Sequence, residues 1–194
     1  EWLDRLPFDI YSVNVHTGAK RLIGRSYRTA PKWSVNGKWA VMYDPIAQVW
    51  NKFDGATGKV VNISDAIGYP MFMESYDKPA PAPAYGIAGW TADGNNVFLY
   101  DAYDWWKIDL TGERQPECLT KGYGRKHGKS IRKMTSNIDK DVFQKDEKVI
   151  VSLWDKDTMD EGVYQLDMKG RLRKLMEGNY VYTIHRFSDN HEYC

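Results

Sequence analysis

The residues best suited to carry chemistry lie at positions 122–130, in the sequence GYGRKHGKS. A phosphate-binding loop requires G-x-x-x-x-G-K-[ST], and Tyr123 occupies the place of its first glycine, so the spacing disfavours nucleotide binding. The basic residues Arg125, Lys126 and His127 are instead candidates for contacting an anion, such as the carboxylate of a peptide terminus. The alternative interpretation is a solvent-exposed, flexible loop face with no ligand.

Other catalytic and binding patterns are missing or incomplete. No serine lies in a G-x-S-x-G nucleophile elbow, so we expect no catalysis from this chain and name no catalytic residue. The acidic residues at 155–161 do not match a calcium loop, because Met159 stands where Asp or Asn is required, and we expect no metal or cofactor. A sugar-binding platform of Trp50, Trp105 and Trp106 is less favoured than the packing of these rings between sheets.

The composition restricts the class of protein. The 194 residues include 27 basic and 26 acidic side chains, and this balance argues against a nucleic acid or an anionic membrane as partner. The hydrophobic content of 42% is sufficient for a packed core. We find no apolar run of about 20 residues that would span a membrane, and no signal peptide at the start. Cys118 and Cys194 do not form a zinc site, and whether they form a disulfide is left open.

One phrase recurs along the chain. WSVNGKWAVMYD begins at Trp33, WTADGNNVFLYD begins at Trp90, and a weaker copy, FQKDEKVIVSLWD, begins at Phe143. The Asn-Gly and Asp-Gly pairs supply the positive φ angles of tight hairpin turns. The apolar residues that follow each turn indicate a strand, which is fully buried in the second copy.

A second phrase accompanies the first. It consists of an aromatic residue, an apolar residue, Asn or Asp, and a turn that ends in glycine. Its copies are YSVNVHTG from Tyr11, WNKFDGATG from Trp50, WKIDLTG from Trp106 and YQLDMKG from Tyr164.

In the second phrase, Asp54, Asp109 and Asp167 stand just before a turn. We expect them to accept local backbone N–H groups and to have a structural role. A short apolar segment follows each turn, so the sequence predicts one hairpin after another.

Repeated units of three to four strands predict an all-β fold, namely a partial β-propeller of about three to four antiparallel four-stranded blades. We expect one propeller segment over 1–194. Its parts are a partial blade over 1–30, a blade over 31–64 with an insertion over 65–89, a blade over 90–120 with a connection over 121–141, a blade over 142–177, and the start of another over 178–194. The Pro-Ala alternation at 78–84 favours polyproline II and excludes a central strand there.

The repeats resemble those of TolB-type propellers and of the non-catalytic propeller in prolyl oligopeptidase and dipeptidyl peptidase IV-like serine peptidases. The segment DWWKIDLTGERQPECLTKGYGRKH, residues 104–127, is similar to longer bacterial members of that peptidase family. Val35-Asn36 and Ala92 depart from the usual Pro-Asp and Pro, but they leave the turn chemistry intact.

The resemblance implies a propeller that gates access to an α/β-hydrolase catalytic domain and helps to hold a peptide substrate, in a periplasmic or extracellular protein. The alternative is a TolB-like scaffold or protein-binding module without an attached enzyme.

An arc of blades has open ends, and the unpaired strands there expose apolar residues. We expect Val13 and Val15 at one end, and Val181, Ile184 and Phe187 at the other. Burial of apolar surface contributes about 25 cal/mol per Å², so several hundred exposed Å² would cost several kcal/mol. The isolated chain is therefore expected to be marginally stable or to self-associate through its blade edges.

Overall fold

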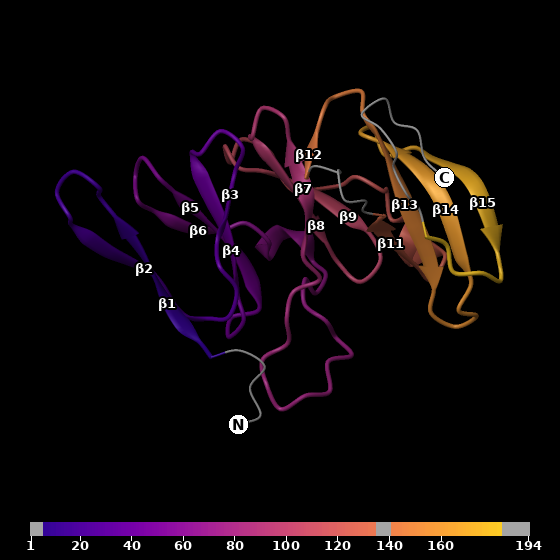
Figure 1. Cartoon of the computed structure of the whole chain (residues 1–194), viewed down its shortest axis with the longest axis horizontal. Coiled ribbons are helices and arrows are strands. Elements are labelled where there is room, and N and C mark those ends of the chain that lie inside the picture. The colour runs from indigo at the N-terminus through magenta and orange to yellow at the C-terminus, as the bar shows by residue number, and fades with distance from the viewer. Residues whose placement is uncertain (1–5, 135–140, 184–194) are drawn as a thin grey trace. The chain divides into compact units, whose positions relative to one another are not determined.

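The computed structural model describes residues 6–134 and 141–183 (Figure 1). The chain is all-β, as predicted, and with the exception of one parallel pair its strands pair antiparallel, as strands do in propeller blades. The residues cluster into two compact units, 1–85 and 86–194, and each is described by itself.

The first unit contains a hairpin and a four-stranded sheet (Figure 1). The hairpin consists of β1 (Phe8–Val13) and β2 (Lys20–Tyr27). The sheet has the order β3 (Lys32–Trp33), β4 (Trp39–Asp44), β5 (Val49–Asp54), β6 (Val60–Asn62), and the short 3-10 helix η1 (Asp65–Ile67) follows it. The core between hairpin and sheet is formed by Ile10, Tyr27, Ala40, Met42 and Phe53.

The Pro-Ala segment folds back within the first unit without entering its sheet. The hydroxyl of Tyr43 donates to the carbonyl of Ala82 at 3.0 Å, and Ala84 forms an isolated antiparallel bridge with Phe72. The backbone N–H of Met73 donates to the carbonyl of Pro83. Proline has no backbone donor, so its carbonyl is the group that remains available for such contacts.

The second unit contains two sheets. The first has the order β10 (Glu117–Cys118), β9 (Trp105–Asp109), β8 (Asn96–Tyr100), β7 (Ile87–Thr91), β12 (Val142–Phe143), and β12 pairs with β7 in parallel. The second has the order β11 (Lys129–Lys133), β13 (Lys148–Asp155), β14 (Glu161–Asp167), β15 (Leu172–Gly178). The short helix α1 (Tyr123–Lys126) lies between β10 and β11 in the chain.

Two boundaries differ from those expected. The last sheet begins with β11, inside the segment expected as a connection over 121–141, whereas residues 142–143 join the preceding sheet instead of opening a blade. Ile131 is the only large aliphatic residue of β11, so the amino-acid pattern of this segment does not indicate a strand. The segment is extended because it pairs with β13. Phe143 packs its ring 5.7 Å from that of Phe98, which attaches β12 to the earlier sheet.

The aspartates before the turns have the structural role that the sequence predicts. Asp54 Oδ1 accepts the backbone N–H groups of Ala56 and Thr57, both at 2.9 Å. Asp109 and Asp167 accept backbone N–H groups in the same way from the turns that follow them. In the Asp-Gly turn of the other phrase, Gly94 has a φ of 69°, as expected.

These turns make stability sensitive to acid. Hydrogen bonds lower the pKa of Asp54, chiefly from the backbone of Thr57, and that of Asp93, chiefly from the hydroxyl of Thr91. A lowered folded-state pKa gives stability that is present above the unfolded pKa of about 3.9 and is lost as the pH falls through the folded value. We expect Asp54→Asn/Asp93→Asn, which keeps an acceptor but cannot titrate, to lose less stability than the wild type between pH 6 and pH 2.5. Urea unfolding at both pH values measures this, and equal losses would contradict it.

Of the three tryptophans, Trp105 packs between two sheets as expected. Trp50 and Trp105 are buried, and Trp106 is half-buried. The Trp105 ring lies 6.1 Å from that of Phe143, and its indole N–H donates to the carbonyl of Ile131 in β11. A sugar platform that includes Trp105 is therefore wrong, because no face of that ring is open to a ligand.

Of the apolar residues expected at open strand edges, only Val13 lies on a strand, at the end of β1, whereas Val15 lies in the following turn and Val181 lies after the end of β15. Val13, Val15 and Val181 are exposed, whereas Ile184 and Phe187 lie outside the described residues. The outer strand β15 carries a bulge near Leu175, where its register against β14 shifts. Self-association through these edges remains a prediction.

Candidate functional site

The predicted anion-contacting residues lie on and directly after α1, and their surroundings differ. The guanidinium of Arg125 points inward and lies 2.9 Å from the carboxylate of Asp101, with 32% of the side chain exposed. Lys126 and His127 are exposed, and the His127 ring packs 4.3 Å from the ring of Tyr123. The interpretation of a merely solvated, flexible loop is therefore wrong for Arg125, since a buried carboxylate binds it.

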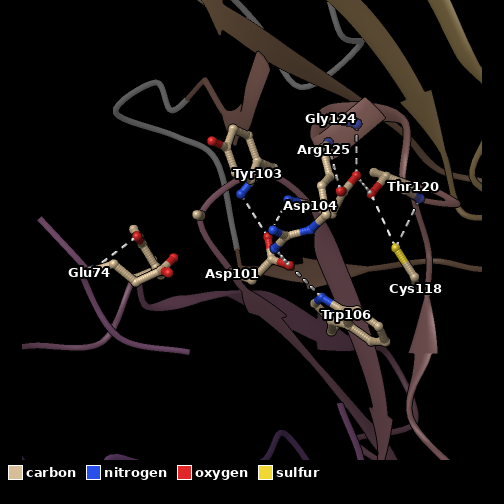
Figure 2. Close-up of polar contacts among 12 residues, drawn as sticks. Glu74, Asp101, Tyr103, Asp104, Trp106, Cys118, Thr120, Gly124 and Arg125 are labelled. Atoms are coloured by element: carbon tan, nitrogen blue, oxygen red, sulfur yellow. Dashed lines mark hydrogen bonds and ion pairs between the residues drawn. The ribbon is translucent and has the colours of Figure 1, made fainter. Parts of the chain in front are cut away.

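Asp101 is a fully buried carboxylate directly after β8. Its Oδ1 accepts the backbone N–H groups of Tyr103 and Asp104 at 2.7 and 2.6 Å. Its Oδ2 accepts the indole N–H of Trp106 at 3.0 Å and the guanidinium of Arg125 at 2.9 Å (Figure 2). Four donors, one of them charged, offset the cost of removing this carboxylate from water.

Asp104 is a second buried carboxylate, and it binds the start of α1. Its Oδ1 accepts the hydroxyl of Thr120 at 2.6 Å and the backbone N–H of Gly124 at 2.9 Å. Its Oδ2 accepts the backbone N–H of Arg125 at 3.0 Å (Figure 2). The first N–H groups of a helix have no partner within the helix, so Asp104 supplies the acceptors that α1 needs. The hydroxyl of Thr120 in turn accepts the backbone N–H of Trp105.

Polar side chains of β11 bind the turn between β8 and β9, which also contains Asp101 and Asp104. Arg132 donates through Nη2 to the carbonyls of Asp101 and Ala102, at 2.7 and 3.2 Å. The buried hydroxyl of Ser130 also donates to the carbonyl of Ala102. These bonds connect β11 of one sheet with the β8–β9 hairpin of the other, within the second unit.

Close backbone packing accompanies these bonds. A Cβ atom on Gly124 would lie 2.6 Å from the carbonyl oxygen of Tyr103 and 2.7 Å from that of Lys129. Both distances are far below ordinary contact, so only glycine permits α1 to approach the hairpin this closely. We define residues 101–104, 119–125 and 130–132 as the hairpin joint.

The hairpin joint is built for structure rather than for proton transfer. Each oxygen of the Asp101 and Asp104 carboxylates already accepts at least one hydrogen bond, and both side chains are closed to solvent. A general base needs access to the proton that it abstracts. We therefore assign these two carboxylates to the positioning of α1 and of the surface next to it.

The thiol of Cys118 also has a structural role, next to the hairpin joint. Its Sγ accepts the backbone N–H of Gly122 at 3.2 Å, and burial raises its pKa. A raised pKa reduces the thiolate fraction, and the thiolate is the reactive form. Cys194 lies outside the described residues.

The surface above the joint presents cations around an aromatic ring. The Tyr103 ring has the guanidinium carbon of Arg125 at 5.0 Å and the ammonium of Lys156 at 4.6 Å. Lys156 and Lys126 are exposed. We call Tyr103, Arg125, Lys126, His127 and Lys156 the basic surface. It can attract an anion, but Asp101 already neutralises part of the charge of Arg125.

The neighbouring Lys129 already has a partner for its positive charge. The ammonium of Lys129 donates to the carboxylate of Glu177 at 2.6 Å. This bond lowers the pKa of Glu177 and raises that of Lys129. Lys129 therefore holds β11 and β15 together and contributes little to attracting a ligand.

The buried carboxylates were not predicted as site residues. A signal was nevertheless present, because the first phrase ends in Asp44, Asp101 or Asp155 in its three copies. In each copy, Oδ1 of that aspartate accepts two backbone N–H groups of the following hairpin. The repeated aspartate thus stands at the start of each hairpin turn and binds its backbone. In the second copy this aspartate, Asp101, is also buried by the surrounding residues.

The fold and the site define an all-β protein made of blade-like antiparallel sheets. No model of a known protein family matches the chain, and no curated protein matches it either. Within residues 6–134 and 141–183, no helix has the length and apolar character to cross a membrane. In the same part of the chain, no three His, Cys, Asp or Glu side chains are grouped to hold a metal ion.

Proposed function

We propose that this chain is a non-catalytic propeller segment of a prolyl oligopeptidase-family serine peptidase, located in the periplasm or outside the cell. The observation that carries the proposal is the repeated strand-turn-strand phrase, whose first two copies occupy equivalent places in two four-strand meanders. Its copies form β3–β4 and β7–β8, each with a Gly turn at a φ of 69°. The similarity of residues 104–127 to bacterial members of that family supports the same assignment.

The role of such a segment is to restrict access to the catalytic cavity of an α/β-hydrolase domain and to contact part of the peptide. The basic surface is the part of the second unit best suited to such a contact. Its exposed ammonium groups on Lys126 and Lys156 complement a peptide carboxylate. The joint beneath it fixes α1, so that the surface is held before a peptide arrives.

The presence of a catalytic domain is tested with a fluorophosphonate probe of activated serines. The longer protein that contains this chain is expected to be labelled, whereas residues 1–194 alone are expected to show neither labelling nor peptide hydrolysis. The control is the longer protein with its G-x-S-x-G serine changed to alanine. Absence of labelling in an intact, folded longer protein would overturn the proposal.

Contact with the peptide is tested separately in the longer protein. Lys126→Glu is expected to raise KM several-fold for a peptide with a free terminal carboxylate and to leave KM for its amide unchanged, because only the first loses an attraction. Lys169→Glu is the matched control, since Lys169 is an exposed cation in the turn after β14. Equal KM changes for both peptides would contradict a carboxylate contact.

The second candidate function is a TolB-like scaffold or protein-binding module. The same repeated phrase supports it. The labelling experiment separates the two, because a scaffold has no activated serine. An unlabelled longer protein that captures a protein partner through these sheets would favour this alternative.

A further inference from the structure

The first copy of the recurring phrase contains the only Asn-Gly pair of the sequence, Asn36-Gly37. In such a pair the backbone nitrogen of the glycine can attack the side-chain amide carbon of the asparagine, because glycine has no Cβ to hinder the approach. Both residues are exposed, in the turn between β3 and β4. The pair is therefore a candidate site of spontaneous covalent modification.

The modification has two steps. The Gly37 nitrogen forms a bond to Cγ of Asn36 and loses its proton, while the side-chain nitrogen takes up a proton and leaves as ammonia, so that a succinimide ring closes. Water then adds to one of the two ring carbonyl groups and breaks its C–N bond. Opening on one side gives aspartate, and opening on the other gives isoaspartate, in which the main chain runs through Cβ and Cγ. Nothing is oxidised or reduced.

The closed turn opposes the first step. The N–H of Gly37 donates to the carbonyl of Ser34 at 2.9 Å, and the ring cannot form without loss of this donor. The Asn36 side chain is also held, because its Oδ1 accepts the hydroxyl of Ser34 at 2.8 Å and the backbone N–H of Lys38 at 3.0 Å. Hydrogen bonds thus restrain both the attacking nitrogen and the amide that it attacks.

The ends of this turn are anchored by buried residues. Ser34 is 4% exposed and Trp39 is 8% exposed. The backbone N–H of Ser34 donates to the carbonyl of Trp39 at 2.8 Å, and the Ser34 hydroxyl accepts the backbone N–H of Trp39 at 3.1 Å. Opening the turn therefore disturbs buried groups, and the free energy of that local opening determines how often Asn36 can react.

The second copy of the phrase shows which product fits the turn. Its pair Asp93-Gly94 takes the place of Asn36-Gly37. Oδ1 of the aspartate accepts the hydroxyl of Thr91 at 2.5 Å and the backbone N–H of Asn95 at 2.9 Å, and the glycine N–H donates to the carbonyl of Thr91 at 2.8 Å. An aspartate at position 36 can accept the same bonds. Isoaspartate adds a carbon atom to the main chain, so the glycine N–H no longer meets its acceptor.

We propose that Asn36 is a gated modification site, whose amide is converted to a carboxylate only when the turn between β3 and β4 opens. The aspartate product leaves the turn intact, because the second copy carries aspartate at this place. The isoaspartate product cannot restore the turn, so it weakens the pairing of β3 with β4. The inference uses the turn alone, and it holds whether the longer protein is a peptidase or a scaffold.

The test compares the folded chain with the same chain in urea, at one mildly alkaline pH. Trypsin releases residues 33–38 as one peptide, since it cleaves after Lys32 and Lys38, and mass spectrometry measures the aspartate and isoaspartate forms of this peptide over time. We expect the reaction at Asn36 to be at least about tenfold faster in urea, because the turn is then open. Asn36→Asp represents the tolerated product, and its Tm is expected to stay within about 2 °C of the wild type.

A matched pair of variants tests the turn as the gate. Ser34→Ala removes the hydroxyl that bonds both Asn36 and the backbone N–H of Trp39, so we expect the folded chain to react at least about threefold faster. Ser75→Ala changes an exposed serine of the same unit and is expected to leave the rate unchanged. In urea the wild type and both variants should react at one rate, which excludes an effect of local sequence.

Equal rates at Asn36 in the folded chain and in urea would overturn the proposal, since the turn would then give no protection. A faster reaction in the folded chain would also overturn it, because the two donors on Oδ1 would then activate the amide carbon. If Ser34→Ala unfolds the first unit, its rate should equal the rate in urea. A rate that stays at the value of the folded wild type would contradict the gate.

Discussion

Replacing Trp105 with alanine is expected to lower the free energy of unfolding of the second unit by about 3–5 kcal/mol. The indole is fully buried, and its ring lies 5.3 Å from that of Tyr100 and 6.1 Å from that of Phe143. Its N–H donates to the carbonyl of Ile131 at 3.1 Å. The substitution leaves a large cavity between the sheet of β9 and the strand β11. Urea denaturation followed by circular dichroism measures the loss.

Two variants separate packing from hydrogen bonding at this position. Trp105→Phe retains an aromatic ring but leaves the carbonyl of Ile131 without its indole donor, so the expected loss is about 1–2 kcal/mol. Trp33→Ala removes the same indole as Trp105→Ala, but from a residue that is 55% exposed. The expected loss in the free energy of unfolding is therefore under about 1.5 kcal/mol. If Trp105→Ala and Trp33→Ala cost the same, Trp105 is not at the centre of a core.

Asp104→Ala is expected to cost the second unit about 3 kcal/mol. The change leaves the N–H groups of Gly124 and Arg125 and the hydroxyl of Thr120 without their acceptor. The close packing of Gly124 gives water little room to replace the carboxylate. We expect α1 to detach locally, which amide exchange at residues 123–126 would detect as faster exchange.

Asp104→Asn serves as the matched control, because its amide oxygen still accepts from Thr120 and Gly124. Only the acceptor for the N–H of Arg125 is lost, so a cost of about 1–2 kcal/mol is expected. Asp157→Ala, at an exposed carboxylate, should stay within about 0.5 kcal/mol of the wild type. A stability of Asp104→Ala equal to that of Asp157→Ala would show that the hairpin joint is dispensable.

The sequence predicts those parts of the fold that local chemistry determines. The Asn-Gly and Asp-Gly turns need positive φ, and the apolar runs after them are long enough to identify β4 and β8. The aspartates at 54, 109 and 167 bind their own turns, so neighbouring residues suffice to assign their role.

Partners that are distant in the sequence could not be predicted in this way. Ser130 and Arg132 reach carbonyls about 30 residues earlier in the chain, and nothing in β11 itself indicates that target. The same limit applies to Arg125. Its basic neighbours indicate a charged loop, but the buried carboxylate that binds its guanidinium lies 24 residues away.

The bulge in β15 has a consequence for how this protein behaves at high concentration. An outer strand with a regular ladder is a template for cross-β growth, since each added strand offers the same pattern to the next. In β15 the register shifts near Leu175, and Arg173 and Lys174 are exposed beside it. An incoming strand meets an interrupted ladder and a positive charge at the same place. We therefore expect the outer edge of the last sheet to resist fibril formation, although Leu175 and Met176 are exposed on it.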